Sequence, residues 1–245
     1  MTLHLHGVVR AAHPLPPAGG WAARKIVVDD LAVVVSSLAD GRSLTDQDAI
    51  AHLAGLCDLV VTGPVLPLRF GTAAADENAA AAAVHALSVP ALRGHLDRLD
   101  GLAEMHVHLA FDEDLALSAV FDGDQDRQAF DGGGTDLGAH IRQGELIAQR
   151  VVVWRRQRAE ALLAPVAAQA REVASVAEQE HTEERRAFLV PLHQVETVRA
   201  TVAGLGDAEG VTVTCTGPLP AFSFLNATVA PEPDRFSKTT SRWGW

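Results

Sequence analysis

The chain begins with hydrophobic and polar residues that alternate one by one over residues 2–9, which is the period of a β-strand. This period places His4 and His6 on one face of the strand and the leucines beside them on the other. Residues 24–38 then read as two more strands around a turn at Asp29 and Asp30. The second of these strands is apolar throughout, so we expect it in the middle of a sheet.

Helical patterns follow in three places. The predicted helices begin at Thr45, Asp76 and Pro90, and the last of them ends at Gly101. The stretch VVTGPVLPLRF lies between the first two helices. We predict that it is extended, because each proline prevents a helix from continuing and biases the preceding residue toward extended angles.

A second block of elements begins with AEMHVHLAF, another alternating strand, in which His106 and His108 share a face. An acidic, glycine-rich loop follows over residues 121–136. The 3.6-residue period then predicts a long helix from about Thr135 to Arg185, kinked or divided at Pro165, with Trp154 on its buried face. RRAFLVPL reads as a strand, QVETVRATVAGLG as a helix and GVTVTCTG as a strand.

The two blocks predict two α+β domains that divide at about residues 98–104. We expect each domain to consist of a sheet with helices on one side. The chain has 245 residues, of which 48% are hydrophobic, and is therefore large enough for two cores.

Composition excludes several function classes. The net charge of -11 disfavours binding to nucleic acid, because that binding requires neutralisation of phosphates. Cys57 and Cys215 form neither a disulfide framework nor a zinc motif. No uncharged apolar run reaches the roughly 18 residues of a membrane-spanning helix, so we expect a soluble cytoplasmic protein without membrane contact.

Two histidine pairs are the main candidates for chemistry. His4 with His6, and His106 with His108, each place two imidazoles on one strand face, which suits a metal if a third ligand joins them. Spacing fixes no third ligand, so we favour solvated or partly packed sheet faces and expect no metal or other cofactor. A small metal-dependent enzyme that uses these pairs is the alternative function. Ser223 has no evident base nearby, and no catalytic motif is present.

The order and spacing of VLPLRFGT, DGLAEMHVHL, AFLVPL and TGPLPAFSF resemble the gas vesicle protein GvpL/GvpF family along almost the whole chain. The resemblance implies an α+β fold with an N-terminal domain over 1–101, which has a mixed sheet with helices. It also implies a modified ferredoxin-like domain over 102–230 that contains the long helix, followed by a tail over 231–245. The residues of the two most recognisable stretches are the candidate partner-binding or structural positions: Pro67, Arg69, Phe70, Gly71, Gly217, Pro218, Pro220, Phe222 and Phe224.

The function implied by the resemblance is that of a non-catalytic accessory protein in the assembly of gas vesicles, the compartments that give cells buoyancy. Its expected partners are the small hydrophobic shell protein and other gas vesicle proteins, during nucleation or growth of the vesicle wall. The expected location is the gas vesicle within the cytoplasm. The Ala79–Leu87 helix and the Pro218–Phe224 segment are candidate contact surfaces.

Two expectations concern individual side chains in these stretches. Arg69 lies among apolar neighbours, so we expect its guanidinium to be buried and paired with an acidic side chain or backbone carbonyls. Contact with a partner protein is the alternative role for Arg69. Phe222 and Phe224 are two residues apart, and we expect them to share one face of a strand.

Overall fold

The computed structural model describes residues 2–16, 21–39, 42–121, 137–176, 182–207 and 210–228. Nearly all of the expected acidic loop and the whole tail over 231–245 lie outside this part of the chain. The chain forms two compact units: the first contains Met1–Met105, Leu189–His193 and Gly217–Trp245, and the second contains His106–Phe188 and Gln194–Thr216. The chain therefore returns twice to the first unit, which differs from the single division expected near residue 101.

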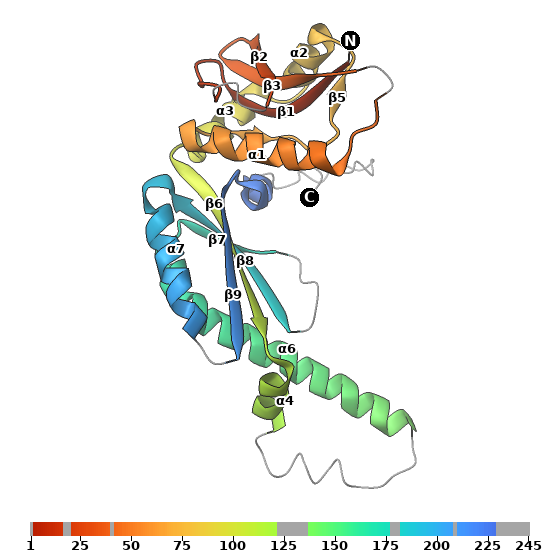
Figure 1. The fold of residues 1–245 in the computed structure, drawn as a ribbon, viewed down its shortest axis with the longest axis vertical. Coiled ribbons are helices and arrows are strands. Elements are labelled where there is room, and N and C mark those ends of the chain that lie inside the picture. The colour runs from red at the N-terminus through yellow and green to blue at the C-terminus, as the bar shows by residue number, and fades with distance from the viewer. Residues whose placement is uncertain are drawn as a thin grey trace. The chain divides into compact units, whose positions relative to one another are not determined.

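The first unit contains a sheet of short and medium strands (Figure 1). Its strands are β1 (Thr2–Arg10), β2 (Ala23–Val28), β3 (Leu31–Leu38), β4 (Leu66–Pro67) and β5 (Ala73–Ala74). Their order is β2-β3-β1-β4, and β5 also pairs with β1. The pairings of β1 with β3, β4 and β5, and of β2 with β3, are all antiparallel. The predicted mixed sheet is therefore wrong, whereas the predicted strands and the turn at Asp29 are confirmed.

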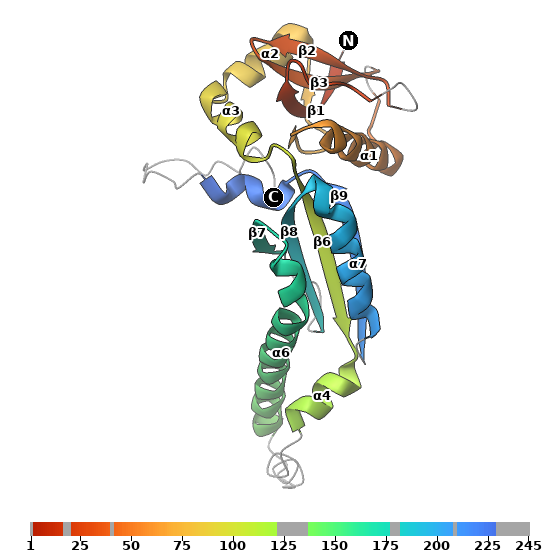
Figure 2. The ribbon, with the colours of Figure 1, turned by 90° about the vertical axis from the view of Figure 1, so that its left-hand side faces the viewer.

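Helices cover both faces of this sheet (Figures 1 and 2). They are α1 (Asp46–Thr62) on one face and α2 (Glu77–His85) and α3 (Val89–Arg98) on the other. Thr45, Asp76 and Ser88 cap their N-termini through side-chain oxygens that accept backbone N–H bonds. Leu31–Val35 of β3 is fully buried on both faces, as expected for a central strand. The expectation of helices on one side only is wrong for this unit.

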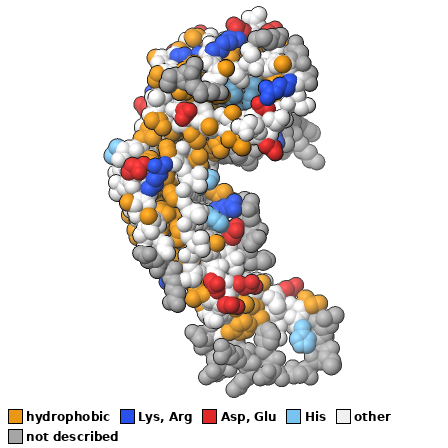
Figure 3. Space-filling model, viewed as in Figure 1, with side chains coloured by type: hydrophobic (Ala, Val, Ile, Leu, Met, Phe, Trp, Pro, Cys, Tyr) orange, Lys and Arg blue, Asp and Glu red, His pale blue; other side chains and the backbone are white. Residues whose placement is uncertain are grey.

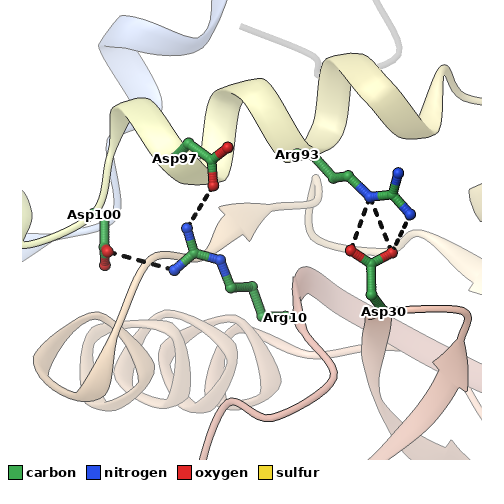
Figure 4. A network of polar contacts seen from close by, with 5 residues as sticks. All are labelled: Arg10, Asp30, Arg93, Asp97 and Asp100. Carbon is green, nitrogen blue, oxygen red and sulfur yellow. Dashed lines mark hydrogen bonds and ion pairs between the residues drawn. The ribbon is translucent and has the colours of Figure 1, made fainter.

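Ion pairs connect α3 to the ends of the strands (Figure 4). Arg93 binds the Asp30 carboxylate at the β2–β3 turn, with its Nε 2.8 Å from one carboxylate oxygen. Arg10, at the end of β1, reaches Asp97 at 2.6 Å and Asp100 at 3.4 Å. These side chains are all largely exposed, so the pairs orient α3 and contribute little to the free energy of unfolding.

The second unit is built on a four-stranded sheet in the order β7-β8-β6-β9. Its elements follow the chain as β6 (Leu102–Phe111), α4 (Glu113–Phe121), α6 (Leu137–Ala167), β7 (Glu172–Ser175), β8 (Glu183–Pro191), α7 (Val195–Ala203) and β9 (Val211–Leu219). Apart from α4, this is the β-α-β-β-α-β order of a ferredoxin-like fold, with the first strand central. The helices α6 and α7 lie along the sheet. Helix α4 lies past the end of the sheet, where it packs against α6 (Figures 1 and 2).

Two sequence predictions in this unit were wrong. The long helix ends at Ala167 rather than near Arg185, and residues 172–175 form the strand β7, which pairs with β8. Helix α4 was not predicted, and it lies before the acidic loop that the sequence indicated. Acidic side chains gather around the start of this helix (Figure 3), where Asp112 also accepts a hydrogen bond from the N–H of Leu115 at 3.0 Å.

The core-facing side of α6 contains aromatic and charged residues. Trp154 is half-buried, and its ring meets the edge of Phe111 with centroids 5.4 Å apart, as the helical period predicted. Arg155 is fully buried, with its Nε 3.2 Å from a carboxylate oxygen of Glu184 on β8. Arg186 approaches the other oxygen of the same carboxylate at 2.7 Å. The sheet and α6 therefore share a buried ionic group that sequence periodicity did not reveal.

Candidate functional site

The Pro67–Gly71 stretch lies beside strand β1 of the first unit. Pro67 pairs with Gly7 of β1, and the N–H of Leu68 donates to the carbonyl of His6 at 2.8 Å. Gly7 lacks space for a side chain, since a Cβ there would lie 2.9 Å from the carbonyl oxygen of Leu66. After Leu68 the chain turns, and Gly71 takes a positive φ of 86° that favours glycine. The stretch is thus fixed to β1 by backbone contacts.

The expectation that the guanidinium of Arg69 is buried is wrong. Its side chain is exposed. The backbone carbonyl of Arg69 makes the local contacts instead, accepting hydrogen bonds from the N–H of Thr72 at 3.1 Å and its Oγ at 2.6 Å. Strand β4 ends at Pro67, and the chain turns at Phe70 and Gly71, so the apolar neighbours in sequence do not surround Arg69 in space.

Three buried histidines meet next to this turn. His4 and His6 project from β1 and His52 from α1, with exposed fractions of 4%, 2% and 5%. One ring nitrogen from each lies within 4.8 Å of the others, and Nδ1 of His6 is 2.8 Å from Nδ1 of His52. The preferred prediction of a solvated or partly packed face is therefore wrong for His4 and His6. Sequence reasoning missed His52, although it is a polar residue at the same helical face as the buried Leu56 and Leu59.

Hydrogen bonds assign the protons of this cluster. Nε2 of His52 lies 3.2 Å from the carbonyl oxygen of Leu68, which only accepts, so Nε2 donates and Nδ1 is bare. Nδ1 of His6 therefore donates to His52, and Nε2 of His6 accepts from Oγ of Ser36 at 2.9 Å. Nε2 of His4 accepts from the N–H of Gly71 at 3.2 Å. All three imidazoles satisfy their partners in the neutral form.

Electrostatics agree with neutral rings. Burial lowers the pKa of His6 to about 3, and the repulsion that a charged His6 would meet from His4 and His52 adds to this shift. Burial likewise lowers the pKa of His52 to about 4, although its bond to the carbonyl of Leu68 opposes the shift. The pKa of His4 is lowered by burial and partly restored by the carboxylate of Asp48.

Aromatic rings close the cluster on two sides. Phe70 presents its edge to His4 and His52, with ring centroids 5.3 and 5.5 Å apart. Trp21 meets His6 edge-on at 4.7 Å. The ring of Trp21 also lies against Gly55 of α1, where a Cβ would be 2.4 Å from it. The Pro67–Gly71 stretch therefore covers a histidine cluster through Leu68, Phe70 and Gly71.

The Gly217–Phe224 stretch also belongs to the first unit. Gly217 precedes Pro218 through a cis peptide bond and leaves no room for a side chain, since a Cβ would lie 2.6 Å from Sδ of Met105. Residues Phe222–Thr228 form a 3₁₀ helix, so the prediction that Phe222 and Phe224 share a strand face is wrong. Phe224 is 2% exposed, and Phe222 packs against the core between the sheet and α1.

A buried carboxylate fixes the start of this 3₁₀ helix. Glu104 of β6 has no exposed surface, and its two oxygens accept from the N–H of Ser223 at 2.8 Å and from its Oγ at 2.7 Å. Arg98 also donates to the carbonyl of Phe224. Sequence reasoning found no partner for Ser223 because Glu104 is 119 residues away. These contacts give Pro218–Phe224 a packed, interior position.

The second histidine pair faces a hollow of about 280 Å³ in the second unit. Its lining residues are His106, Val107, His108, Arg185, Thr214 and Thr216. Nε2 of His108 is 3.3 Å from a carboxylate oxygen of Glu183. Among the residues that the structure describes, the one group of three metal-type side chains around a point is His4, His6 and His52.

Comparison with solved structures defines the class of this fold. It matches the crystal structure of gas vesicle protein GvpF from Microcystis aeruginosa with a TM-score of 0.77 and 17% identity, over 91% of this chain and 98% of that one. The crystal structure of GvpF from Anabaena sp. PCC7120 also gives a TM-score of 0.77, at 19% identity and the same coverage. The predicted two-domain α+β class, with a ferredoxin-like part, is confirmed.

Sequence comparison then identifies the family. The model of the gas vesicle synthesis protein GvpL/GvpF family matches residues 3–226, so the chain belongs to this family. Gas vesicle protein F of Streptomyces sp. (strain CB03234) is 27% identical over 241 residues, which cover 92% of this chain and all of that protein. Among the described helices, none combines the length and apolar composition that crossing a membrane requires.

Proposed function

We propose that this protein is a non-catalytic accessory protein of gas vesicle assembly that works in the cytoplasm. It binds the small hydrophobic shell protein and other gas vesicle proteins during nucleation or growth of the vesicle wall. The observation that carries the proposal is the family match over residues 3–226, which includes both units.

An apolar stripe on α1 supports binding to a hydrophobic subunit. Ile50, Leu53 and Val61 are exposed by 61%, 42% and 63%, and their spacing places them along one side of the helix. Shell subunits that line a gas space have apolar surface to cover before assembly, and exposed apolar patches are typical of protein-binding sites. We therefore assign the docking surface to this stripe.

The two surfaces suggested by the sequence fit this role less well. Pro218–Phe224 lies mainly inside the first unit and contributes to its core. Helix α2 buries Ala80 and Val84 against the sheet, and its exposed positions are polar apart from Ala82, so they offer little apolar area. The motif stretches accordingly shape the first unit, and the α1 stripe contacts the partner.

Co-expression with the shell protein tests the proposal. The shell protein should co-purify with the wild-type chain, and a variant with Ile50→Lys and Val61→Lys should recover much less of it. The matched control is Val27→Lys on β2, where the side chain is 60% exposed but lies off α1. Loss of binding in the control as well, with both proteins folded by circular dichroism, would move the docking surface away from α1.

Vesicle formation tests the function as a whole. Deleting the gene in a vesicle-forming cell should reduce or abolish vesicles seen by electron microscopy, and the wild-type gene should restore them. Normal vesicles in the deletion strain, together with a reproducible failure to co-purify any gas vesicle protein, would refute the proposed function.

A further inference from the structure

We propose that His4, His6 and His52 form a binding site for a divalent transition-metal ion, with Zn²⁺ the ion that best fits the site. The site goes beyond the proposed assembly role, because it does not depend on which protein the chain binds. Imidazole is a preferred ligand of Zn²⁺, Cu²⁺ and Ni²⁺, and three histidines with an open fourth position form a recurrent zinc arrangement.

The ring nitrogens lie close to the positions that a tetrahedral ion requires. Zn–N bonds of about 2.0–2.1 Å place two ligand nitrogens roughly 3.3 Å apart in a tetrahedral site. The Nδ1 atoms of His6 and His52 are 2.8 Å apart, so they need to separate slightly. All three ligand atoms already lie within 4.8 Å of one another, so the third histidine needs only a small movement.

The groups behind two of the rings suit metal ligation. A metal-bound histidine usually donates its other N–H to an oxygen, which fixes its ring and tautomer. Nε2 of His52 already donates to the carbonyl of Leu68, which leaves Nδ1 free for an ion. In His6 the proton moves from Nδ1 to Nε2. The Ser36 hydroxyl, which donates to Nε2 in the metal-free protein, then accepts a hydrogen bond from Nε2 instead. A rotating hydroxyl makes this exchange without loss of a hydrogen bond.

The third ligand, His4, is hydrogen-bonded to the neighbouring turn, so metal binding affects that turn. Nε2 of His4 accepts a 3.2 Å bond from the N–H of Gly71, and this bond is lost when His4 binds an ion. The rings enter the site neutral, so binding releases no proton from them near neutral pH. The carboxylate of Asp48 raises the pKa of His4, so its negative charge favours positive charge at this position. The ion therefore links β1 and α1 and rearranges the turn at Phe70 and Gly71.

Access to the site is restricted. The three histidines are at most 5% exposed, and Phe70 and Trp21 cover them. An ion reaches them when the turn over Leu68–Gly71 opens, so association and release are expected to be slow. Slow release makes the ion a structural rather than an exchanging ligand.

The test uses the full chain after treatment with a chelator and dialysis. Titration with ZnCl₂ in a calorimeter should show one equivalent bound, and Co²⁺ should give the intense visible absorption of a tetrahedral site. His52→Gln should weaken binding more than about 100-fold, beyond the loss typical of an outer hydrogen-bond partner. The matched control is the variant with His106→Gln and His108→Gln, which should bind like the wild type.

Three outcomes would overturn the proposal. They are a folded wild-type chain that binds no Zn²⁺, unchanged affinity in His52→Gln, and loss of binding in the His106 and His108 control. If His52→Gln fails to fold, the wild-type titration and the Co²⁺ spectrum decide alone, since an octahedral or absent Co²⁺ spectrum refutes a buried three-histidine site. A rise of the melting temperature with Zn²⁺ in the wild type, absent in His6→Gln, supports the same ligands independently.

Discussion

The buried carboxylate of Glu104 should be required to hold the Phe222–Thr228 helix in place. We predict that Glu104→Ala destabilises the first unit strongly, because the side chain is fully buried. A second reason is that two donors of Ser223, its N–H and its Oγ, point at this one carboxylate. Removing the acceptor leaves both donors without it in a largely enclosed position.

The expected magnitude follows from the two bonds. Each hydrogen bond to a charged group contributes about 1.5–3 kcal/mol, so the loss of two in Glu104→Ala should cost about 3–6 kcal/mol of unfolding free energy. Glu104→Gln preserves the shape and should cost only about 1–2 kcal/mol, since the amide oxygen still accepts from the N–H and the Ser223 hydroxyl can accept from the amide nitrogen. Ser223→Ala should fall between these two values.

Urea denaturation followed by circular dichroism measures these differences, and hydrogen exchange of the Ser223 amide reports the local contact. In Glu104→Ala the Ser223 amide should exchange much faster, while amides in α7 of the second unit keep their wild-type protection. A loss below about 1 kcal/mol in Glu104→Ala, with Ser223 still protected, would show that the carboxylate does not fix this segment. A double-mutant cycle with Ser223→Ala then separates the pairwise contribution from cavity effects.

Three further predictions concern charged and titrating groups. Glu184→Leu should lower the unfolding free energy by about 3–5 kcal/mol, because it leaves the buried guanidinium of Arg155 without this carboxylate. Adding Arg155→Leu removes that buried charge and should recover part of the loss, which thermal melts of both variants would show. Arg69→Ala should change stability by less than about 0.5 kcal/mol, since its side chain is exposed, so reduced co-purification with the shell protein at an unchanged melting temperature would reveal a partner contact. Metal-free protein should lose stability as pH falls from about 6.5 toward 4, because His6 and His52 bind protons in the unfolded chain but stay neutral in the native state. Each of the two histidines should lower the unfolding free energy by about 1.4 kcal/mol per pH unit in that window. Urea midpoints at a series of pH values measure this slope, and a flat profile would contradict neutral buried rings.

Local patterns were enough to predict most elements. The alternation around His4, the apolar run LAVVV and the caps at Thr45 and Asp76 predicted β1, β3, α1 and α2 correctly, because these signals depend on neighbours a few residues apart. Where a local signal was ambiguous it misled. Val173 continued the helical period after Ala167, yet the chain leaves the helix there and Val173 lies in β7, which pairs with β8.

The sequence alone determined the family, the α+β class, the positions of most strands and helices, and the absence of strong signals for catalysis. Only the tertiary structure decided which distant side chains meet. His52 contacts His6, which is 46 residues away, and Glu104 contacts Ser223, which is 119 residues away. Arg69 is exposed because the chain turns at Gly71, a change of direction that apolar neighbours do not encode. Short-range periodicity fixes the direction of a side chain within its own element, whereas burial and pairing depend on the elements that pack against it, and no local pattern specifies those.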